Sequence, residues 1–345
     1  MRPALSLAFA LVALPCFAED ASLEVAMLVG TPGEEASTLI FQSPGAGAPA
    51  EGAATLRHLP WAVIRGRVLP GTRTALVVAD TARRGDGSFG ATLLRISPGA
   101  APEVLADRVF HATRPLVTST GRVFVERGIE GPARVDRLSI DEVNPMTGEA
   151  RPVHAFEGYT THLVGALGDE LLVYRVRYQH ADLVAVHMDT GTTRKLRGEL
   201  VPFARDFSVD EVTRVLRWTT LETATGDWVV VAMNADEGVE TVIARAQRPS
   251  LAASAWPGER WAFNPGGDLG LALSEGEDQR RIAPLGPGAD VVRAATGNGA
   301  WVALDHTRPS SLPAPFVMSQ DGKRVLRIAV PEGMRSEILG FVEVR

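Results

Sequence analysis

Residues 161–198 read THLVGALGDELLVYRVRYQHADLVAVHMDTGTTRKLRG. The segment contains four short runs rich in Leu, Val, Tyr and Thr, which are residue types that favour β-strands. Short breaks separate the runs at 168–169, 178–181 and 189–191, and the first and last breaks contain the Gly and Asp of tight turns. Four consecutive strands joined by short turns make a meander, which is the pattern of one blade of a β-propeller.

The same pattern recurs along the chain. The most hydrophobic strands of successive units begin near residues 23, 75, 122, 171, 214, 260 and 300, and their spacing is close to the roughly 40 to 50 residues of blade repeats. Three strands are expected in residues 22–58 and a single strand in 337–345. We therefore predict an all-β fold, a seven-bladed β-propeller with a 3+1 closure in which Ile338–Val344 pairs with Leu23–Val29 and protects the strand edges.

Two alternatives to this architecture stay open. Counts of six or eight blades are compatible with the sequence, because the fifth and sixth units are the least regular. Residues 207–216 offer a helical alternative, since Ser208 and Glu211 have the spacing of a capping box. We predict a strand and a turn for this segment, because a 3.6-residue apolar period is not convincing anywhere in the chain.

Two segments carry a resemblance to a known family. MDTGTTRKLRG (188–198) and SQDGKRVLRI (319–328) resemble the repeat motifs of TolB-like and WD40-like bacterial β-propellers, in which such turns precede a strand. The chain departs from the motif at 264–267, where Asn-Pro-Gly-Gly lacks the Asp, and at 119–121, which read Ser-Thr-Gly. The motif is a turn signature, so the resemblance implies the fold. It also implies an exported protein. Many members of this group have a binding or scaffold role, and some are domains of hydrolases.

Composition and charge restrict the class of partner. The chain has 345 residues with 45% hydrophobic and 22% charged residues, which suits one domain with an ample core. The net charge is −6 and the basic residues form no stripe, so a nucleic-acid partner is not expected. We expect a monomer, with residues 19–345 forming a single propeller domain.

The first 18 residues have the pattern of a secretory signal peptide. Arg2 supplies a positive start, Leu5–Leu14 an apolar core, and Cys16-Phe17-Ala18 a small-residue site for cleavage near Ala18. The apolar core is shorter than the ~20 residues that span a bilayer, so we predict a periplasmic or secreted protein without a transmembrane segment. The alternatives are a cytoplasmic protein with an apolar N-terminus and a lipoprotein anchored through Cys16, which Pro15 disfavours.

Motifs for common chemistries are missing from the sequence. There is no Gly-x-Ser-x-Gly nucleophile elbow, no phosphate-binding loop and no His-Glu-x-x-His pair. Cleavage after Ala18 would remove the single cysteine, which excludes disulfides and thiol catalysis in the mature chain. We therefore predict no catalytic residues, no metal and no cofactor.

The candidate ligand-binding residues come from the expected inner strands of the blades. The first strand of each blade lines the central channel of a propeller, so residues that are far apart in sequence meet there. We expect an anion- or metal-binding patch at the channel mouth, and the alternative is a set of structural or solvated polar groups. The candidates lie near the start of predicted first strands: His111, Arg114, His162, Arg205, Asp206 and Arg293.

The leading functional hypothesis is an exported, non-catalytic binding or scaffold module for a small ligand or another envelope protein. The alternative is a propeller enzyme, a lactonase, lyase or hydrolase, with a His/Asp or metal site at the channel mouth. A meeting of His111, His162 and Asp206 at one point would favour the enzyme. Asp206, Asp210 and Glu211 also offer carboxylates for glycoside hydrolysis, although a solvated turn is the preferred interpretation.

Overall fold

The structure is a computed structural model. The signal-peptide prediction for residues 1–18 and the lipoprotein alternative at Cys16 lie outside the described part of the chain. The described residues are 23–60, 62–83, 89–129, 134, 136–246, 252–254, 260–264, 271–275, 278–282, 285, 288–308 and 310–343.

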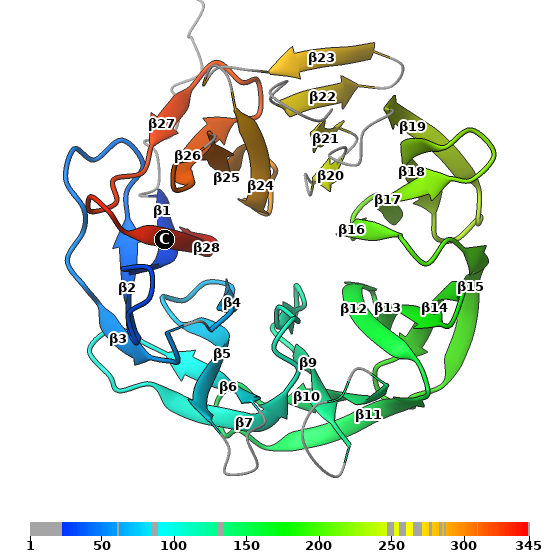
Figure 1. Ribbon diagram of the computed structural model, residues 1–345, viewed down its shortest axis with the longest axis horizontal. Helices are drawn as coiled ribbons and strands as arrows, with labels where there is room; N and C mark the ends of the chain where they lie inside the picture. The colour runs from blue at the N-terminus through cyan, green and yellow to red at the C-terminus, as the bar shows by residue number, and fades with distance from the viewer. Residues whose placement is uncertain are drawn as a thin grey trace, which may run out of the picture.

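The fold is all-β and has the arrangement of a β-propeller. The strands of the described ranges form five four-stranded sheets and one eight-stranded sheet, and these residues contain no helix. The sheets stand side by side in a ring around a central axis, with β28, β4, β12, β16, β20 and β24 nearest the centre (Figure 1). In the described part of the chain no helical segment has the length and apolarity to cross a bilayer.

The first half of the ring has the following strands. One sheet has the order β28-β1-β2-β3, with β28 at Arg335–Glu343, β1 at Leu23–Gly30, β2 at Ala36–Gln42 and β3 at Ala54–Arg57. The eight-stranded sheet begins with β4 at Arg65–Val68, β5 at Ala75–Arg83, β6 at Phe89–Ile96 and β7 at Glu103–Val109. It continues with β8 at Leu116–Val117, β9 at Val123–Gly128, β10 at Arg137–Val143 and β11 at Ala150–Glu157.

The second half consists of four sheets in simple sequence order. They are β12 Thr160–Leu167, β13 Glu170–Arg177, β14 His180–His187 and β15 Thr193–Leu200; then β16 Arg205–Asp210, β17 Val215–Glu222, β18 Asp227–Asn234 and β19 Glu240–Ala246. The next are β20 Ala252–Ser254, β21 Arg260–Asn264, β22 Leu271–Glu275 and β23 Asp278–Ile282; the last are β24 Ala289–Ala295, β25 Trp301–Thr307, β26 Ala314–Ser319 and β27 Val325–Arg327.

One sheet contains both ends of the described chain. The strand β28 is antiparallel to β1, with Val25 opposite Phe341 and Leu28 opposite Glu337, and a bulge lies between Ala26 and Met27. The eight-stranded sheet consists of two units, β4–β7 and β8–β11, which are joined by the single pair Val109 and Arg127. Each unit has the four strands of a propeller blade.

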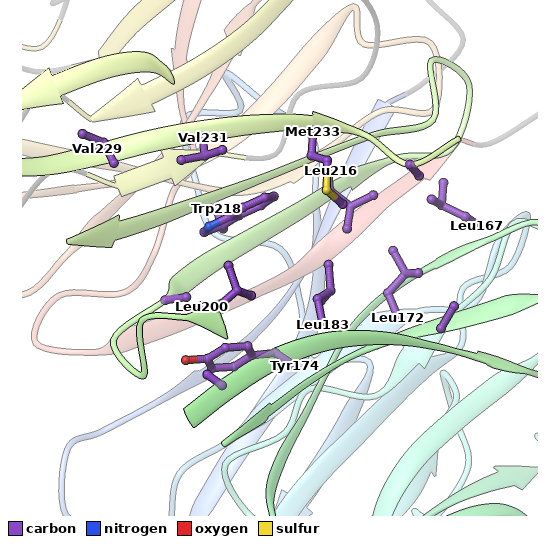
Figure 2. Packing of buried hydrophobic residues seen from close by; sticks show 14 residues of the cluster. Leu167, Leu172, Tyr174, Leu183, Leu200, Leu216, Trp218, Val229, Val231 and Met233 are labelled. Atoms are coloured by element: carbon purple, nitrogen blue, oxygen red, sulfur yellow. The ribbon is translucent and has the colours of Figure 1, made fainter. Parts of the chain in front are cut away.

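The hydrophobic core lies between neighbouring sheets. In β13, Leu172 and Tyr174 pack in the cluster shared with the β16–β19 sheet (Figure 2), whereas Leu171 and Val173 pack on the opposite side. Successive side chains of a strand point to opposite faces, so a strand covered on both faces must be apolar throughout. This explains why the central strands are continuous apolar runs rather than alternating ones. Trp218 is the largest fully buried side chain of this layer.

Close to the axis the sheets approach so tightly that glycine is required. A Cβ atom on Gly165 of β12 would lie 2.3 Å from a methyl carbon of Val209 in β16. A Cβ atom on Gly66 of β4 would lie 2.8 Å from a methyl carbon of Leu339 in β28. The missing side chains allow the inner strands to converge, and this convergence brings residues of different sheets to one central site.

Candidate binding site at the hub of the ring

A pocket of about 250 Å³ lies where the inner strands converge. It is built from β4, from the loop before β8, from β9, from β12 and from β16, which are separated by up to about 140 residues along the chain. We call it the hub pocket. Its lining residues are Arg67, Ala112, Thr113, Arg114, Pro115, Leu116, Glu126, His162, Leu163, Val164 and Phe207.

Side chains of several inner strands meet at the hub. Arg67 is the third residue of β4, His162 the third residue of β12 and Phe207 the third residue of β16. Glu337, the third residue of β28, contacts the same pocket wall through Arg114. Different inner strands thus bring a cation, an imidazole, a phenyl ring and a carboxylate to the hub.

Arg67 is a cation without a described partner. Its guanidinium makes no hydrogen bond or ion pair with any residue of the described ranges. The residue is exposed to solvent and lines the pocket. Burial, and to a lesser extent the charge of Arg114, lowers the pKa of Arg67 to about 10, so the guanidinium remains charged at neutral pH.

Arg114 is held in place by neighbours from the opposite side of the ring. Its guanidinium donates to Glu337 Oε1 at 2.8 Å and to the carbonyl oxygen of Arg293 at 3.4 Å. Arg65 lies 3.7 Å from the other oxygen of Glu337. Burial lowers the pKa of Arg114, and the contact with Glu337 opposes that shift. Glu337 therefore shares its one negative charge between two arginines.

Glu126 fixes the loop that carries Arg114. The Glu126 side chain has no water-accessible surface. Thr113 Oγ1 donates to Glu126 Oε2, and the backbone N–H of Leu163 donates to Glu126 Oε1 at 3.0 Å. Burial raises the pKa of Glu126 to about 7, although both hydrogen bonds favour the ionised form. The carboxyl group ties the loop to β12, and the fully buried Glu126 stands in the pocket wall.

The remaining wall of the pocket is apolar and aromatic. The ring centroid of His162 lies 6.1 Å from that of Tyr174, and the Phe207 ring lies between Tyr174 and Trp218 at 5.0 Å and 6.1 Å. Burial lowers the pKa of His162, so its imidazole adds no charge at neutral pH. The hub pocket is therefore lined by both cationic and apolar side chains.

The six predicted candidates fall into three groups. Arg114 and His162 line the hub pocket. Arg293 of β24 touches Arg114 through its carbonyl oxygen, and its own guanidinium pairs with the buried Asp305 at 2.7 Å. The others, His111, Arg205 and Asp206, are not among the residues that line the pocket.

These three have local contacts instead. His111 lies on the exposed loop after β7, edge-on to Phe110 with ring centroids 5.1 Å apart. Arg205 lies over the Trp228 ring at 4.5 Å and pairs with Asp206 at 3.4 Å. Asp206 has a φ of 54° at an irregular point of β16, which directs this carboxylate away from a regular ladder position. Burial raises the pKa of Asp206.

The carboxylate and metal hypotheses have little support in the described residues. No group of three His, Cys, Asp or Glu side chains there is arranged to hold a metal ion, so His111, His162 and Asp206 do not form such a set. Asp210 accepts hydrogen bonds from the backbone N–H groups of Val212 and Thr213. It caps the turn after β16, as the strand-and-turn prediction for 207–216 requires.

Sequence reasoning missed Arg67, Glu126 and Glu337. Arg67 lies in the short run RGRV, where it resembles a surface residue of an alternating strand. A usable signal existed: Arg67 and Glu337 lie on the inner strands β4 and β28, as the candidate His162 lies on β12. Including every charged residue of the inner strands would have found both.

Comparisons with known proteins support the fold and go no further. No family model matches the chain, and no curated protein matches it in sequence. The fold resembles that of TolB from Acinetobacter baumannii, with a TM-score of 0.52 and 13% identity over 93% of this chain and 68% of TolB. The suspected likeness to TolB-like propellers is confirmed at this level.

Two peptidases contain a similar propeller. Prolyl oligopeptidase B from Galerina marginata has a TM-score of 0.63 and 12% identity, and a puromycin-hydrolyzing peptidase from Mycobacterium tuberculosis has 0.58 and 14%. The alignments cover 88% and 79% of this chain but 49% and 46% of the peptidases, so this chain spans about half of their length. Identities this low show a shared fold and carry no function with them.

Proposed function

We propose that this β-propeller is a non-catalytic binding or scaffold module that holds a small ligand or a segment of a partner protein in the hub pocket. The observation that carries the proposal is Arg67, a charged group that lines the pocket without a described carboxylate beside it. Arg67 is exposed to solvent, so its guanidinium can be reached by an external anion and can form charge-assisted hydrogen bonds with it.

We further propose that the ring has seven blades and that the chain is exported. The sheet order β28-β1-β2-β3 and the two four-stranded units within the eight-stranded sheet support this count and a 3+1 closure. The signal-peptide pattern of residues 1–18 supports a periplasmic or secreted location for a single domain over 19–345. The expected partner is then a small ligand or another envelope protein, and the expected state is a monomer.

Filling the pocket tests the binding proposal without removing any of its contacts. Ala112 is exposed and lines the pocket, so Ala112→Trp places a large ring in the ligand space. Ala101, an exposed residue before β7, provides the control Ala101→Trp. Both variants and the wild type serve as bait in extracts of cells that make the protein. We expect capture of the same ligand or protein by wild type and Ala101→Trp, and its loss in Ala112→Trp. Equal capture by all three would show that the hub pocket is not the binding site.

The enzyme alternative rests on one specific observation. A buried carboxyl group with a pKa of about 7 is the kind of perturbed group that active sites contain. Against it, Glu126 has no accessible surface and both its oxygens accept hydrogen bonds from the protein. Turnover of a lactone, an ester or an oligosaccharide that disappears in Glu126→Gln would replace the binding proposal with a lactonase, hydrolase or lyase.

A further inference from the structure

Resting on the proposed function, we propose that the hub pocket binds the carboxylate group of a small, partly apolar monoanion, with the guanidinium of Arg67 as its principal partner. The ligand is either a free organic acid or the C-terminal carboxylate of a peptide chain, which share this chemistry. A carboxylate matches the planar fork of a guanidinium and accepts two parallel hydrogen bonds from it.

The charge balance around the pocket favours an anionic ligand. Four arginines, Arg65, Arg67, Arg114 and Arg293, stand near the hub. Arg65 and Arg114 share Glu337, and Arg293 pairs with Asp305. Arg67 is left without a carboxylate among the described residues, and Arg114 is only half neutralised. The four guanidiniums exceed the two carboxylates, Glu337 and Asp305, by two positive charges, so the hub favours an anion. A carboxylate beside Arg67 would neutralise one of these charges.

The state of Arg67 in the empty pocket favours anion binding. Burial and the nearby charge of Arg114 make the protonated form of Arg67 less stable than it is in water. A carboxylate beside Arg67 would offset both effects, because opposite charges at close range favour the charged form. Glu126 does not compete for this position, since its oxygens are engaged with Thr113 and the Leu163 backbone.

The apolar lining of the pocket determines the body of the ligand. Leu116, Leu163, Val164 and Phe207 line the same pocket as Arg67 with apolar side chains. A volume of 250 Å³ corresponds to about eight water molecules at about 30 Å³ each. This space accommodates a short acyl or aryl group, or the last side chain of a peptide. It is small for a drug-sized ligand, whose pockets begin at about 300 Å³.

Titration calorimetry of the full mature chain with matched probes tests the inference. The small probes are benzoate and its neutral analogue benzamide, and the peptide probes are an N-acetylated dipeptide ending in leucine with a free or an amidated C-terminus. Inorganic phosphate serves as the competing anion. We expect the free acids to bind at least about tenfold more tightly than their amides, as the loss of a charge-assisted hydrogen bond implies.

The variants identify the residue responsible. Arg67→Gln should weaken benzoate binding by at least about tenfold. The benzoate affinity of Arg67→Lys should lie between those of wild type and Arg67→Gln, because lysine keeps the charge but cannot donate two parallel hydrogen bonds. Arg57, an exposed arginine of the outer strand β3, provides the control Arg57→Gln, which should bind as the wild type does. Thermal melting confirms that each variant is folded.

Each outcome decides the inference. Tighter binding of the peptide acid than of benzoate would identify the source as a chain terminus, and the reverse would identify a free organic acid. Equal binding of acids and amides, unchanged binding in Arg67→Gln, tighter binding of phosphate than of either acid, or no binding of any acid would overturn it. If Ala112→Trp loses the captured ligand while Arg67→Gln retains it, the binding function stands and the carboxylate inference fails.

Discussion

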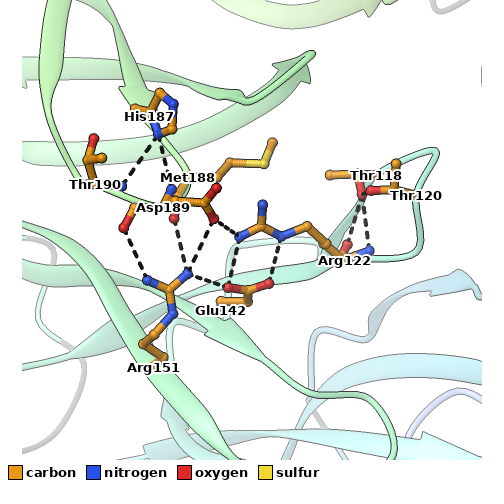
Figure 3. A network of polar contacts seen from close by, with 9 residues as sticks. All are labelled: Thr118, Thr120, Arg122, Glu142, Arg151, His187, Met188, Asp189 and Thr190. Carbon is orange, nitrogen blue, oxygen red and sulfur yellow. Dashed lines mark hydrogen bonds and ion pairs between the residues drawn. The ribbon is translucent and has the colours of Figure 1, made fainter.

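Carboxyl groups in two regions of this molecule respond to their surroundings in opposite ways. The first region is a turn network of Arg122, Glu142, Arg151 and Asp189, which connects the β8–β11 unit to the β14–β15 turn (Figure 3). Arg122 donates to both oxygens of Glu142, at 2.7 Å and 3.0 Å, and Arg151 donates at 2.6 Å. The hydrogen bonds from Arg122 lower the pKa of Glu142 more than burial raises it.

The second region is the hub, where burial dominates. The pKa of Glu126 is raised to about 7, and the pKa of Asp305 is raised although Arg293 pairs with it. The two groups differ in access to water and in the kind of donor. Arginines donate to Glu142, whereas the neutral Thr113 hydroxyl and Leu163 backbone donate to Glu126. Arginine–carboxylate pairs in the turn network have a structural role, whereas burial in the hub raises the pKa of Glu126 and Asp305, and Arg67 has no carboxylate partner among the described residues. This contrast is the reason why we propose the hub, and not the network, as the site for an external anion.

The largest predicted effect is the pH dependence that Glu126 gives to stability. Its pKa is raised on folding, so the folded state keeps a proton that the unfolded chain loses above about pH 4.5. This contribution is fully present below that pH, declines as pH rises to about 7, and then stays constant. The change from 4.5 to about 7 corresponds to roughly 3 kcal/mol.

The variant Glu126→Gln isolates this contribution, because an amide keeps the shape and does not titrate. Urea unfolding of both proteins at several pH values gives the free energy of unfolding. We expect the wild type to lose stability relative to Glu126→Gln between pH 4.5 and pH 7. A stability difference that does not change with pH would mean that Glu126 is ionised in the folded protein like Glu142, and the contrast between hub and network would disappear.

The second effect concerns Arg114, which connects the two sides of the hub. Arg114→Gln leaves Glu337 largely buried with only the longer contact to Arg65. Removing one partner of a partly buried ion pair destabilises a protein by more than the intact pair stabilises it, because the other charge is left unpaired. We therefore expect the free energy of unfolding at neutral pH to fall by about 2 kcal/mol. The double variant Arg114→Gln/Glu337→Gln should recover about half of this loss. If the stability loss of the double variant equalled the sum of the two single losses, Arg114 and Glu337 would not be energetically coupled.

The third effect tests the turn network. Arg122→Gln removes hydrogen bonds from Glu142 and from Asp189, both of which retain Arg151 nearby. Because these groups are partly exposed, we expect a loss of about 1 kcal/mol at neutral pH. Glu142 contributes its stability above its unfolded pKa, so the difference between wild type and variant should shrink as pH falls through the folded pKa of Glu142. If the stability difference between wild type and Arg122→Gln grew as the pH fell, Glu142 would not be the ionised partner of Arg122 in the folded protein.

Much of the fold is readable from the sequence because it depends on local features. The Asp and Gly of residues 189–191 form the β14–β15 turn, with Gly191 at a φ of 67°, and the apolar run of β18 is covered on both faces. Asp210 ends β16 and caps the next turn, which explains why a capping-box pattern at Ser208 does not begin a helix.

The hub was less predictable because it depends on non-local contacts. Glu126 lies in VFVERG, where an alternating pattern predicts an exposed side chain. Its burial follows from the loop before β8, which folds onto β9 through Thr113, and from β12 of the next sheet. Arg114 and His162 were predicted because a long-range rule, that inner strands converge, was available. No such rule tells which arginine lacks a partner.

The smallest predicted effect on stability belongs to the residue with the largest predicted effect on binding. Arg67 has no described partner to lose, and its charge is disfavoured by burial and by Arg114. Arg67→Gln should therefore change the free energy of unfolding by less than about 0.5 kcal/mol, or increase it slightly. Denaturant unfolding at pH 7 in the absence of ligand measures this. A loss of unfolding free energy as large as that of Arg122→Gln would mean that Arg67 has a structural partner. Arg67 would then not be an unpaired cation, and the hub would no longer differ from the turn network in this respect.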